Sequence, residues 1–167
     1  MRFTLFVLPL GALLSGCGDD TDDTAGMDTD VMDTDVMDVT CPVDLCATYG
    51  AAVPAVASEV TNRAAADPQF SADFAPLVAE GEAAVTAFKG SLTNFISDAY
   101  GCSTDLYTGP SMEASHAGLN ITQAEYDAFI GLIAGVLVDS NVPQNHIDDC
   151  FAPPLVDPAF AAKFIGK

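Results

Sequence analysis

The sequence predicts an all-α fold in a single small domain with N-terminal attachments. Two long stretches carry apolar residues at three- and four-residue intervals, which is the period of a helix with one buried face. Proline, glycine and capping residues punctuate these stretches at their ends. No segment alternates with a two-residue period for long enough to predict a strand. Half of the 167 residues are hydrophobic, and no second block of composition indicates another folded domain.

Residues 1–16 have the pattern of an export signal. Met1-Arg2 is a short basic start, 3–14 is an apolar run too short to span a membrane, and Leu14-Ser-Gly-Cys17 follows it. The ending is typical of a bacterial lipoprotein signal, in which Cys17 is lipidated and becomes the new N-terminus. The alternative is an ordinary signal peptide that leaves Cys17 as a disulfide partner. Both predict export, and lipidation predicts anchoring in the bacterial cell envelope, at the periplasmic face or the outer surface.

Residues 17–40 comprise the cysteine to be lipidated and an acidic segment. Nine aspartates and no lysine or arginine lie between 18 and 40, partly in repeats of Met-Asp-Thr-Asp-Val. Charges at this density repel one another and leave little apolar surface to bury, which predicts a disordered tether. Calcium binding is the alternative. The segment lacks the twelve-residue loop with a central glycine and a terminal glutamate that such a site uses.

The predicted domain, residues 41–167, carries fifteen acidic and four basic side chains, for a net charge near −11. It therefore has no basic patch for phosphates, and nucleic acid is not an expected partner. Its four cysteines are Cys41, Cys46, Cys102 and Cys150. An even number in an oxidising compartment predicts two disulfides, with three possible pairings. Zinc is the alternative, although no Cys-x-x-Cys pair is present.

Three helices are predicted, in chain order. The first runs from about Val53 to Ala66 and stops at Asp67-Pro68. The second runs from about Glu80 to Tyr100 before Gly101. The third follows Thr122, which forms a capping box with Glu125, and ends at Val142-Pro143. Each of the last two helices has an apolar stripe. The stripe of the second comprises Val85, Phe88, Leu92, Phe95, Ile96 and Ala99, and that of the third comprises Tyr126, Phe129, Ile130, Ile133, Val136 and Leu137. Taken alone, such stripes indicate ordinary core.

The C-terminal region contains Pro153-Pro154, which removes backbone donors and obstructs the preceding turn. This pair predicts that a final helix is split or short at this point. The segment from Asp157 to Lys167 is then expected to pack separately.

The most informative motif is 107–122, which reads Tyr-Thr-Gly-Pro-Ser-Met-Glu-Ala-Ser-His-Ala-Gly-Leu-Asn-Ile-Thr. It sets His116 between Met112 and Ile121, with glycines that let the backbone pass close to a flat ligand. The stretch resembles the proximal segment of group I truncated haemoglobins, and the resemblance extends from about Tyr49 to about Pro154. It implies a two-over-two helical sandwich that binds haem b, with His116 as the proximal iron ligand.

The resemblance also implies the other haem contacts. They are Phe74, Phe88, Leu92, Phe95, Ile96, Met112, Ile121 and Tyr126. The distal pocket would contain Val60, Thr61, Phe88 and Leu92. Many relatives have a tyrosine and a glutamine where this chain has Thr61 and Leu92, so we expect weak polar stabilisation of bound oxygen and unimpaired binding of carbon monoxide or nitric oxide. His146 is interpreted as facing solvent, with a second iron ligand as the alternative.

The function that follows from the resemblance is the binding of oxygen or another diatomic gas in the envelope, for transport, sensing or scavenging. One alternative is a haem enzyme, a nitric oxide dioxygenase or a weak peroxidase. A dioxygenase would depend on a redox partner that the sequence does not identify, and a peroxidase on a distal acid or base that is not visible at the matched positions. The other alternative is a haem-free, anchored interaction domain.

Overall fold

A computed structural model describes residues 41–167, and every regular element in this range is a helix. The predicted signal, the lipidation of Cys17 and the acidic tether lie outside the described residues. The elements are α1 (Leu45–Tyr49), a 3₁₀ turn (Gly50–Ala52), α2 (Val53–Ala66), α3 (Ser71–Ala79), α4 (Glu82–Ala99), α5 (Met112–His116), α6 (Gln123–Asp139), α7 (Gln144–His146), a π turn (Ile147–Phe151), α8 (Ala152–Val156) and α9 (Pro158–Ala161). None of these helices is both long and apolar enough to cross a membrane.

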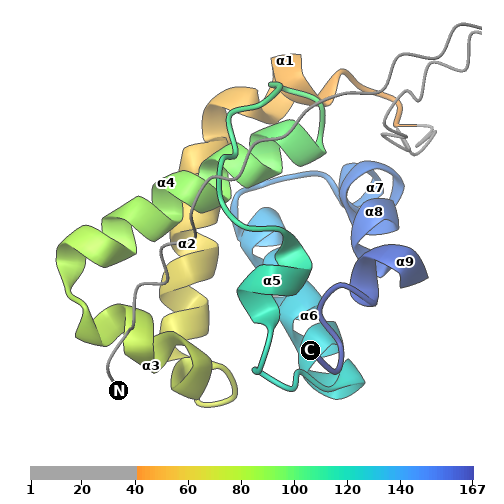
Figure 1. The fold of residues 1–167 in the computed structure, drawn as a ribbon. Helices are drawn as coiled ribbons and strands as arrows, with labels where there is room; N and C mark the ends of the chain where they lie inside the picture. The colour runs from red at the N-terminus through yellow and green to blue at the C-terminus, as the bar shows by residue number, and fades with distance from the viewer. Residues whose placement is uncertain (1–40) are drawn as a thin grey trace, which may run out of the picture. The chain divides into compact units, whose positions relative to one another are not determined.

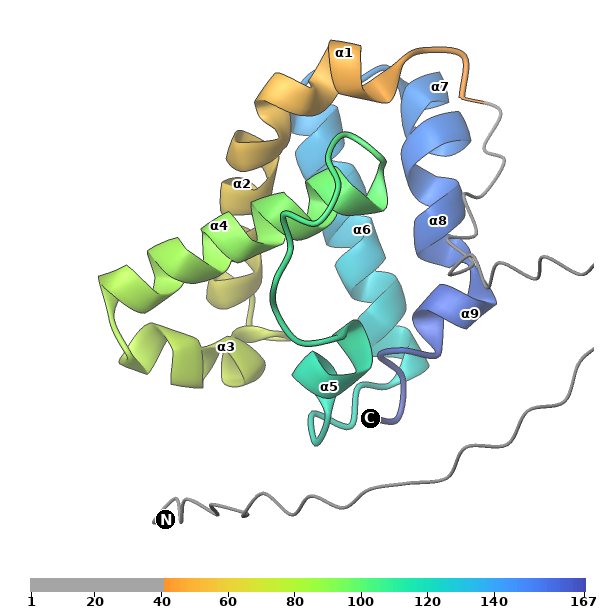
Figure 2. The same ribbon diagram turned by 45° about the horizontal axis from the view of Figure 1, so that its top comes forward.

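Helix α2 lies at the centre of the packing and makes close contacts with α4, α6 and α3 (Figures 1 and 2). Its buried residues are Ala57, Val60, Thr61 and Ala64, which recur at three- and four-residue spacing on one face. The two alanines are completely buried. Because their side chains are small, neighbouring helices can approach the α2 backbone closely.

A cluster of buried apolar residues lies where α6 ends. Leu137, Val142 and Ile147 are buried together there, against partly buried side chains that include Tyr49 and Phe151. The Tyr100 hydroxyl donates a hydrogen bond to the Phe151 carbonyl at 2.9 Å.

Two disulfides close the same end of the molecule. Cys41 bonds to Cys150, and Cys46 bonds to Cys102. The prediction of two disulfides is thus confirmed, and the pairing is settled. Because all four cysteines are disulfide-bonded, none of them is available as a zinc ligand. The bridges join the start of the described chain to the π turn and to the loop after α4.

The predicted bounds of the three helices agree with α2, α4 and α6 to within two or three residues. At the start of α6, the Thr122 side chain accepts from the Glu125 backbone N–H at 3.2 Å, and Glu125 accepts in return from the Thr122 N–H at 2.8 Å. The predicted capping box is therefore confirmed.

The prediction that the final helix is split or short is confirmed, because α8 and α9 have five and four residues, but the break does not lie at Pro153-Pro154. A π turn leads directly into α8, and the two prolines lie in the first turn of that helix, where backbone N–H groups need no partner within the helix. The helical path is instead interrupted at Asp157. Its carboxylate accepts hydrogen bonds from the N–H groups of Ala159 and Phe160 and so caps α9.

The expectation that 157–167 packs separately was also wrong. The Gly166 N–H donates to the Ile121 carbonyl at 2.9 Å, and the Asn120 N–H donates to the Lys167 carbonyl at 2.6 Å. The Lys167 ammonium forms an ion pair with Glu113 at 2.7 Å. The C-terminus consequently lies against the region of α5 and the start of α6, as Figures 1 and 2 show.

Candidate functional site

The site is built around α5, a helix of five residues that carries His116 at its end. Ser111 caps the helix by accepting from the Ala114 N–H at 3.2 Å. Gly118 then adopts a positive φ of 86°, a conformation that glycine takes without strain. The chain can therefore leave the helix just after the histidine and continue to the capping box of α6.

His116 has one ring nitrogen engaged by the backbone. Its Nδ1 lies 2.6 Å from the Met112 carbonyl oxygen. A carbonyl can only accept, so the hydrogen of a neutral imidazole must be on Nδ1. Nε2 then keeps its lone pair, which is the state that a metal-ligating histidine needs, and the carbonyl fixes the orientation of the ring.

Phe164, in the C-terminal segment, covers one side of the imidazole. The two ring centroids are 4.6 Å apart with an interplanar angle of 60°. Phe164 also contacts Tyr126, at 5.5 Å, and Phe160, at 5.0 Å. His116 of the 107–122 motif is thus packed against a small aromatic cluster from α6 and the C-terminal segment.

Tyr126, predicted to contact haem, is 7% exposed and has a structural role in the described residues. Its hydroxyl donates to the Leu155 carbonyl at 2.6 Å, which ties α6 to α8. Burial, with smaller contributions from Asp127 and Asp157, raises the pKa of Tyr126 to about 12.

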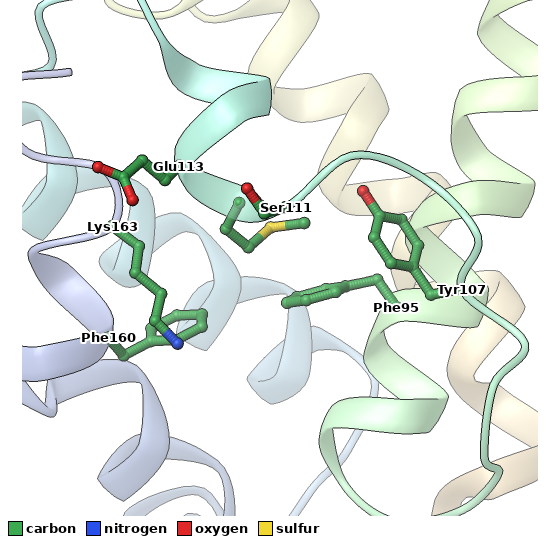
Figure 3. A pocket seen from close by; sticks show the side chains of 7 residues that line it. Phe95, Tyr107, Ser111, Glu113, Phe160 and Lys163 are labelled. Carbon is green, nitrogen blue, oxygen red and sulfur yellow. The ribbon is translucent and has the colours of Figure 1, made fainter. Parts of the chain in front are cut away.

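An open pocket of about 350 Å³ lies beside α5 (Figure 3). Phe95 of α4 forms one wall, and Phe160 and Lys163 form another. The remaining lining residues, from the loop and α5, are Tyr107, Ser111, Met112 and Glu113. The pocket contains Phe95 and Met112 from the predicted haem contacts, but not His116.

The other predicted haem contacts form separate groups. Phe74 of α3 and Phe88 of α4 lie against each other with their centroids 6.0 Å apart, and Phe88 is 37% exposed. Leu92 and Ile96, one and two turns further along α4, are partly buried, as is Ile121. No side chain of α4 is fully buried, so the predicted stripe is only half covered by the described residues.

The predicted distal residues of α2 are well buried. Val60 is 4% exposed and Thr61 is 2% exposed. The Thr61 hydroxyl donates to the Ala57 carbonyl at 2.8 Å, one turn earlier in the same helix. Its hydrogen is therefore already used within α2.

His146 does not face solvent freely, so that prediction needs correction. Its ring is partly buried, its Nδ1 lies 2.5 Å from the Tyr49 hydroxyl, and the ring centroids are 5.9 Å apart. The pair belongs to the disulfide-bonded end of the domain. Within residues 41–167 there is no cluster of three or more histidine, cysteine or acidic side chains that could hold a metal ion without another ligand.

The sequence interpretation missed the contribution of the C-terminal segment to this region. A sequence signal for this contribution was present, because Phe160 and Phe164 are four residues apart and follow Asp157-Pro158, which is a typical helix start.

Comparison with models of protein families and with curated proteins gave no match for this chain.

Proposed function

We propose that residues 41–167 form a haem-binding domain of the truncated globin type, in which His116 holds the iron and a diatomic gas is the ligand. The observation that carries this proposal is the hydrogen bond from His116 Nδ1 to the Met112 carbonyl. It leaves Nε2 as the basic nitrogen of a partly buried ring at the end of α5.

Several of the predicted haem contacts have side chains that suit a flat apolar group. Helix α4 presents the half-covered side chains of Phe88, Leu92, Phe95 and Ile96, and Met112 lies on the helix that carries His116. Covering these side chains would remove apolar surface from water, which is favourable at about 25 cal/mol per Å². When bound, haem supplies an iron centre that takes up small gaseous ligands.

The helix arrangement also supports the proposal. Helix α2 packs on α4, as the resemblance to truncated globins implies for the pair that covers the distal side. Helix α6 is joined to α8 through the Tyr126 hydroxyl. These pairs agree with a two-over-two sandwich.

The chemistry of α2 favours carbon monoxide or nitric oxide over stably held oxygen. Bound oxygen is polar and is retained by a distal hydrogen-bond donor. The hydrogen of the Thr61 hydroxyl is committed to Ala57, and Val60 and Leu92 have none to offer. Rapid loss or autoxidation of an oxygen complex is therefore expected.

The test is reconstitution of residues 41–167, folded under oxidising conditions, with haem. Three proteins are compared by visible absorption: wild type, His116→Gly, and His146→Gly as a matched control. We expect a Soret band in wild type and His146→Gly that shifts on reduction and on addition of carbon monoxide. His116→Gly should lose or alter this spectrum and regain it with added imidazole. Absence of haem binding by wild type, or an unchanged spectrum in His116→Gly, would favour a haem-free interaction domain.

For the whole chain we propose export and anchoring through a lipid on Cys17. The disulfides Cys41–Cys150 and Cys46–Cys102 support this, because such bridges persist in oxidising compartments. The full-length protein made in a bacterial host should partition into detergent and carry the mass of a lipid, whereas Cys17→Ser should not. A full-length protein that stays in the aqueous phase would contradict the anchor without affecting the haem test.

A further inference from the structure

The pocket beside α5 has a chemistry of its own, distinct from the histidine. Its walls are largely aromatic and aliphatic: Phe95 and Phe160 lie on opposite sides (Figure 3), and Met112 also lines the pocket. Such walls suit a flat apolar body. The exposed residues Ser111, Glu113 and Lys163 at its rim leave it open to solvent.

Lys163 is the unusual residue of this rim. Among the basic side chains of residues 41–167, Arg63 pairs with Glu59 and Asp139, Lys89 bonds to Asn62, and Lys167 pairs with Glu113. The Lys163 ammonium lies 5.9 Å from the centroid of the Phe160 ring and has no carboxylate within ion-pair distance in the described residues. Among residues 41–167, which are rich in acids, Lys163 therefore has no anionic partner.

Two of the other polar groups of the pocket, Tyr107 and Glu113, are already engaged, whereas the Ser111 hydroxyl accepts from the Ala114 N–H and can still donate. The Tyr107 hydroxyl donates to the Pro110 carbonyl at 2.8 Å, so it can only accept from a ligand. Glu113 is held by Lys167 at 2.7 Å, and this contact, first through its hydrogen bond and then through its charge, lowers the Glu113 pKa. An incoming ligand thus meets apolar walls, the Ser111 hydroxyl and one positive charge that pairs with no carboxylate of residues 41–167.

We propose that this pocket binds a carboxylate carried on a flat apolar body, with Lys163 as its ionic partner and Phe95, Met112 and Phe160 holding the body. Two sources would present this chemistry: a propionate of haem, which rests on the function proposed above, or a free aromatic carboxylate, which does not. The proposal assigns the same contacts in both cases.

The test uses 2-naphthoate as the probe and 2-naphthamide as its neutral counterpart, titrated by calorimetry onto the haem-free domain. Wild type is compared with Lys163→Met and with Lys89→Met, which removes an equal charge from α4 outside the pocket. Wild type and Lys89→Met should prefer naphthoate over naphthamide by roughly 1.5- to fivefold, the range expected for an exposed ion pair. Lys163→Met should lose this preference while keeping its helical circular dichroism, since the side chain is exposed.

Equal affinity for the two probes, or an unchanged preference in Lys163→Met, would overturn the proposal. Titrations with haem distinguish the two sources of the carboxylate. If a propionate is the occupant, haem excludes naphthoate, and Lys163→Met weakens binding of haem but not of its dimethyl ester. If naphthoate binds the haem-loaded domain undiminished, the ligand is a free carboxylate. Because the first titrations use no haem, failure of the haem proposal leaves this result interpretable.

Discussion

Phe164 packs its ring against the imidazole of His116, with centroids 4.6 Å apart and planes inclined at 60°. Two residues 48 positions apart in the chain are thereby joined, and backbone hydrogen bonds from Gly166 to Ile121 and from Asn120 to Lys167 hold the segments together. The imidazole is consequently restrained twice, by the Met112 carbonyl at Nδ1 and by an aromatic ring at its side. Both restraints come from residues of the chain, Met112 and Phe164.

Replacing Phe164 with leucine should loosen this restraint. Leucine keeps much of the apolar volume but removes the ring, so the free energy of unfolding should fall by only about 1 kcal/mol. The His116 Cε1 proton should lose its ring-current shift in the NMR spectrum. The His146 signals serve as the internal control, because that ring packs on Tyr49. An unshifted His116 signal would show that the two rings are not in contact in solution.

Tyr126 should make the domain sensitive to alkaline pH. Its pKa is raised to about 12 by burial, above its usual value of 10, so the folded state retains a proton that the unfolded state releases. Stability from this group is fully present below pH 10 and is lost as the pH rises toward 12. Tyr100, whose pKa burial also raises, contributes in the same direction.

The measurement is urea unfolding of wild type and Tyr126→Phe at several pH values from 8 to 11.5. At pH 8 the variant should be less stable by about 1–2 kcal/mol, because the Leu155 carbonyl loses its donor. The gap should narrow above pH 10. A gap that does not depend on pH would show that Tyr126 ionises as it would in the unfolded chain.

Sequence periodicity and end signals were enough to predict the three long helices, because Asp67-Pro68, Gly101 and the Thr122–Glu125 box act locally. The contacts of 157–167 were missed because they depend on chain reversal at Asp157, and nothing local specifies which surface the returning segment meets. The break in the final helix was misplaced because a π turn leads directly into α8, so that both prolines lie in its first turn, where a missing backbone donor is tolerated.

The surroundings of His116 could be predicted only in part for a similar reason. A motif can single out His116, and the Nδ1 contact of this residue lies one turn away in sequence. The neighbours supplied by other elements depend on how the helices pack. Phe95 and Met112 meet at one pocket, whereas Tyr126 is committed to a hydrogen bond with Leu155.

The two disulfides should contribute unequally to stability. The Cys41–Cys150 bridge spans 109 residues and the Cys46–Cys102 bridge spans 56. In the chain-entropy model each contributes about 4–5 kcal/mol, and the longer loop about 0.6 kcal/mol more. Cys150 is also fully buried, so its loss leaves unfilled space.

These values are checked by urea unfolding of the paired variants Cys41→Ala with Cys150→Ala, and Cys46→Ala with Cys102→Ala. The first pair should be the less stable, and both should show a steeper dependence on urea, since their unfolded chains expose more surface. Greater loss in the second pair would mean that the packing of α1 against the loop after α4 outweighs loop length.

Asp98 should make the loop that leads into the 107–122 motif sensitive to acid pH. Its carboxylate accepts from the Ser103 hydroxyl at 2.6 Å and from the Tyr107 N–H at 2.7 Å, and these bonds lower its pKa below 3.8. The stabilisation is therefore present above pH 3.8 and is lost as the pH falls through the lower, folded-state pKa. Amide exchange of Tyr107, expressed as a protection factor, should decrease over that range in wild type. In Asp98→Asn it should be low throughout, whereas the exposed Asp149→Asn should follow wild type.

The same loop should affect the pocket. Tyr107 lines the pocket and packs on Phe95, with the two ring centroids 5.4 Å apart, so naphthoate affinity should decline together with the protection of the Tyr107 amide. Unchanged affinity in Asp98→Asn would show that the pocket forms independently of the loop.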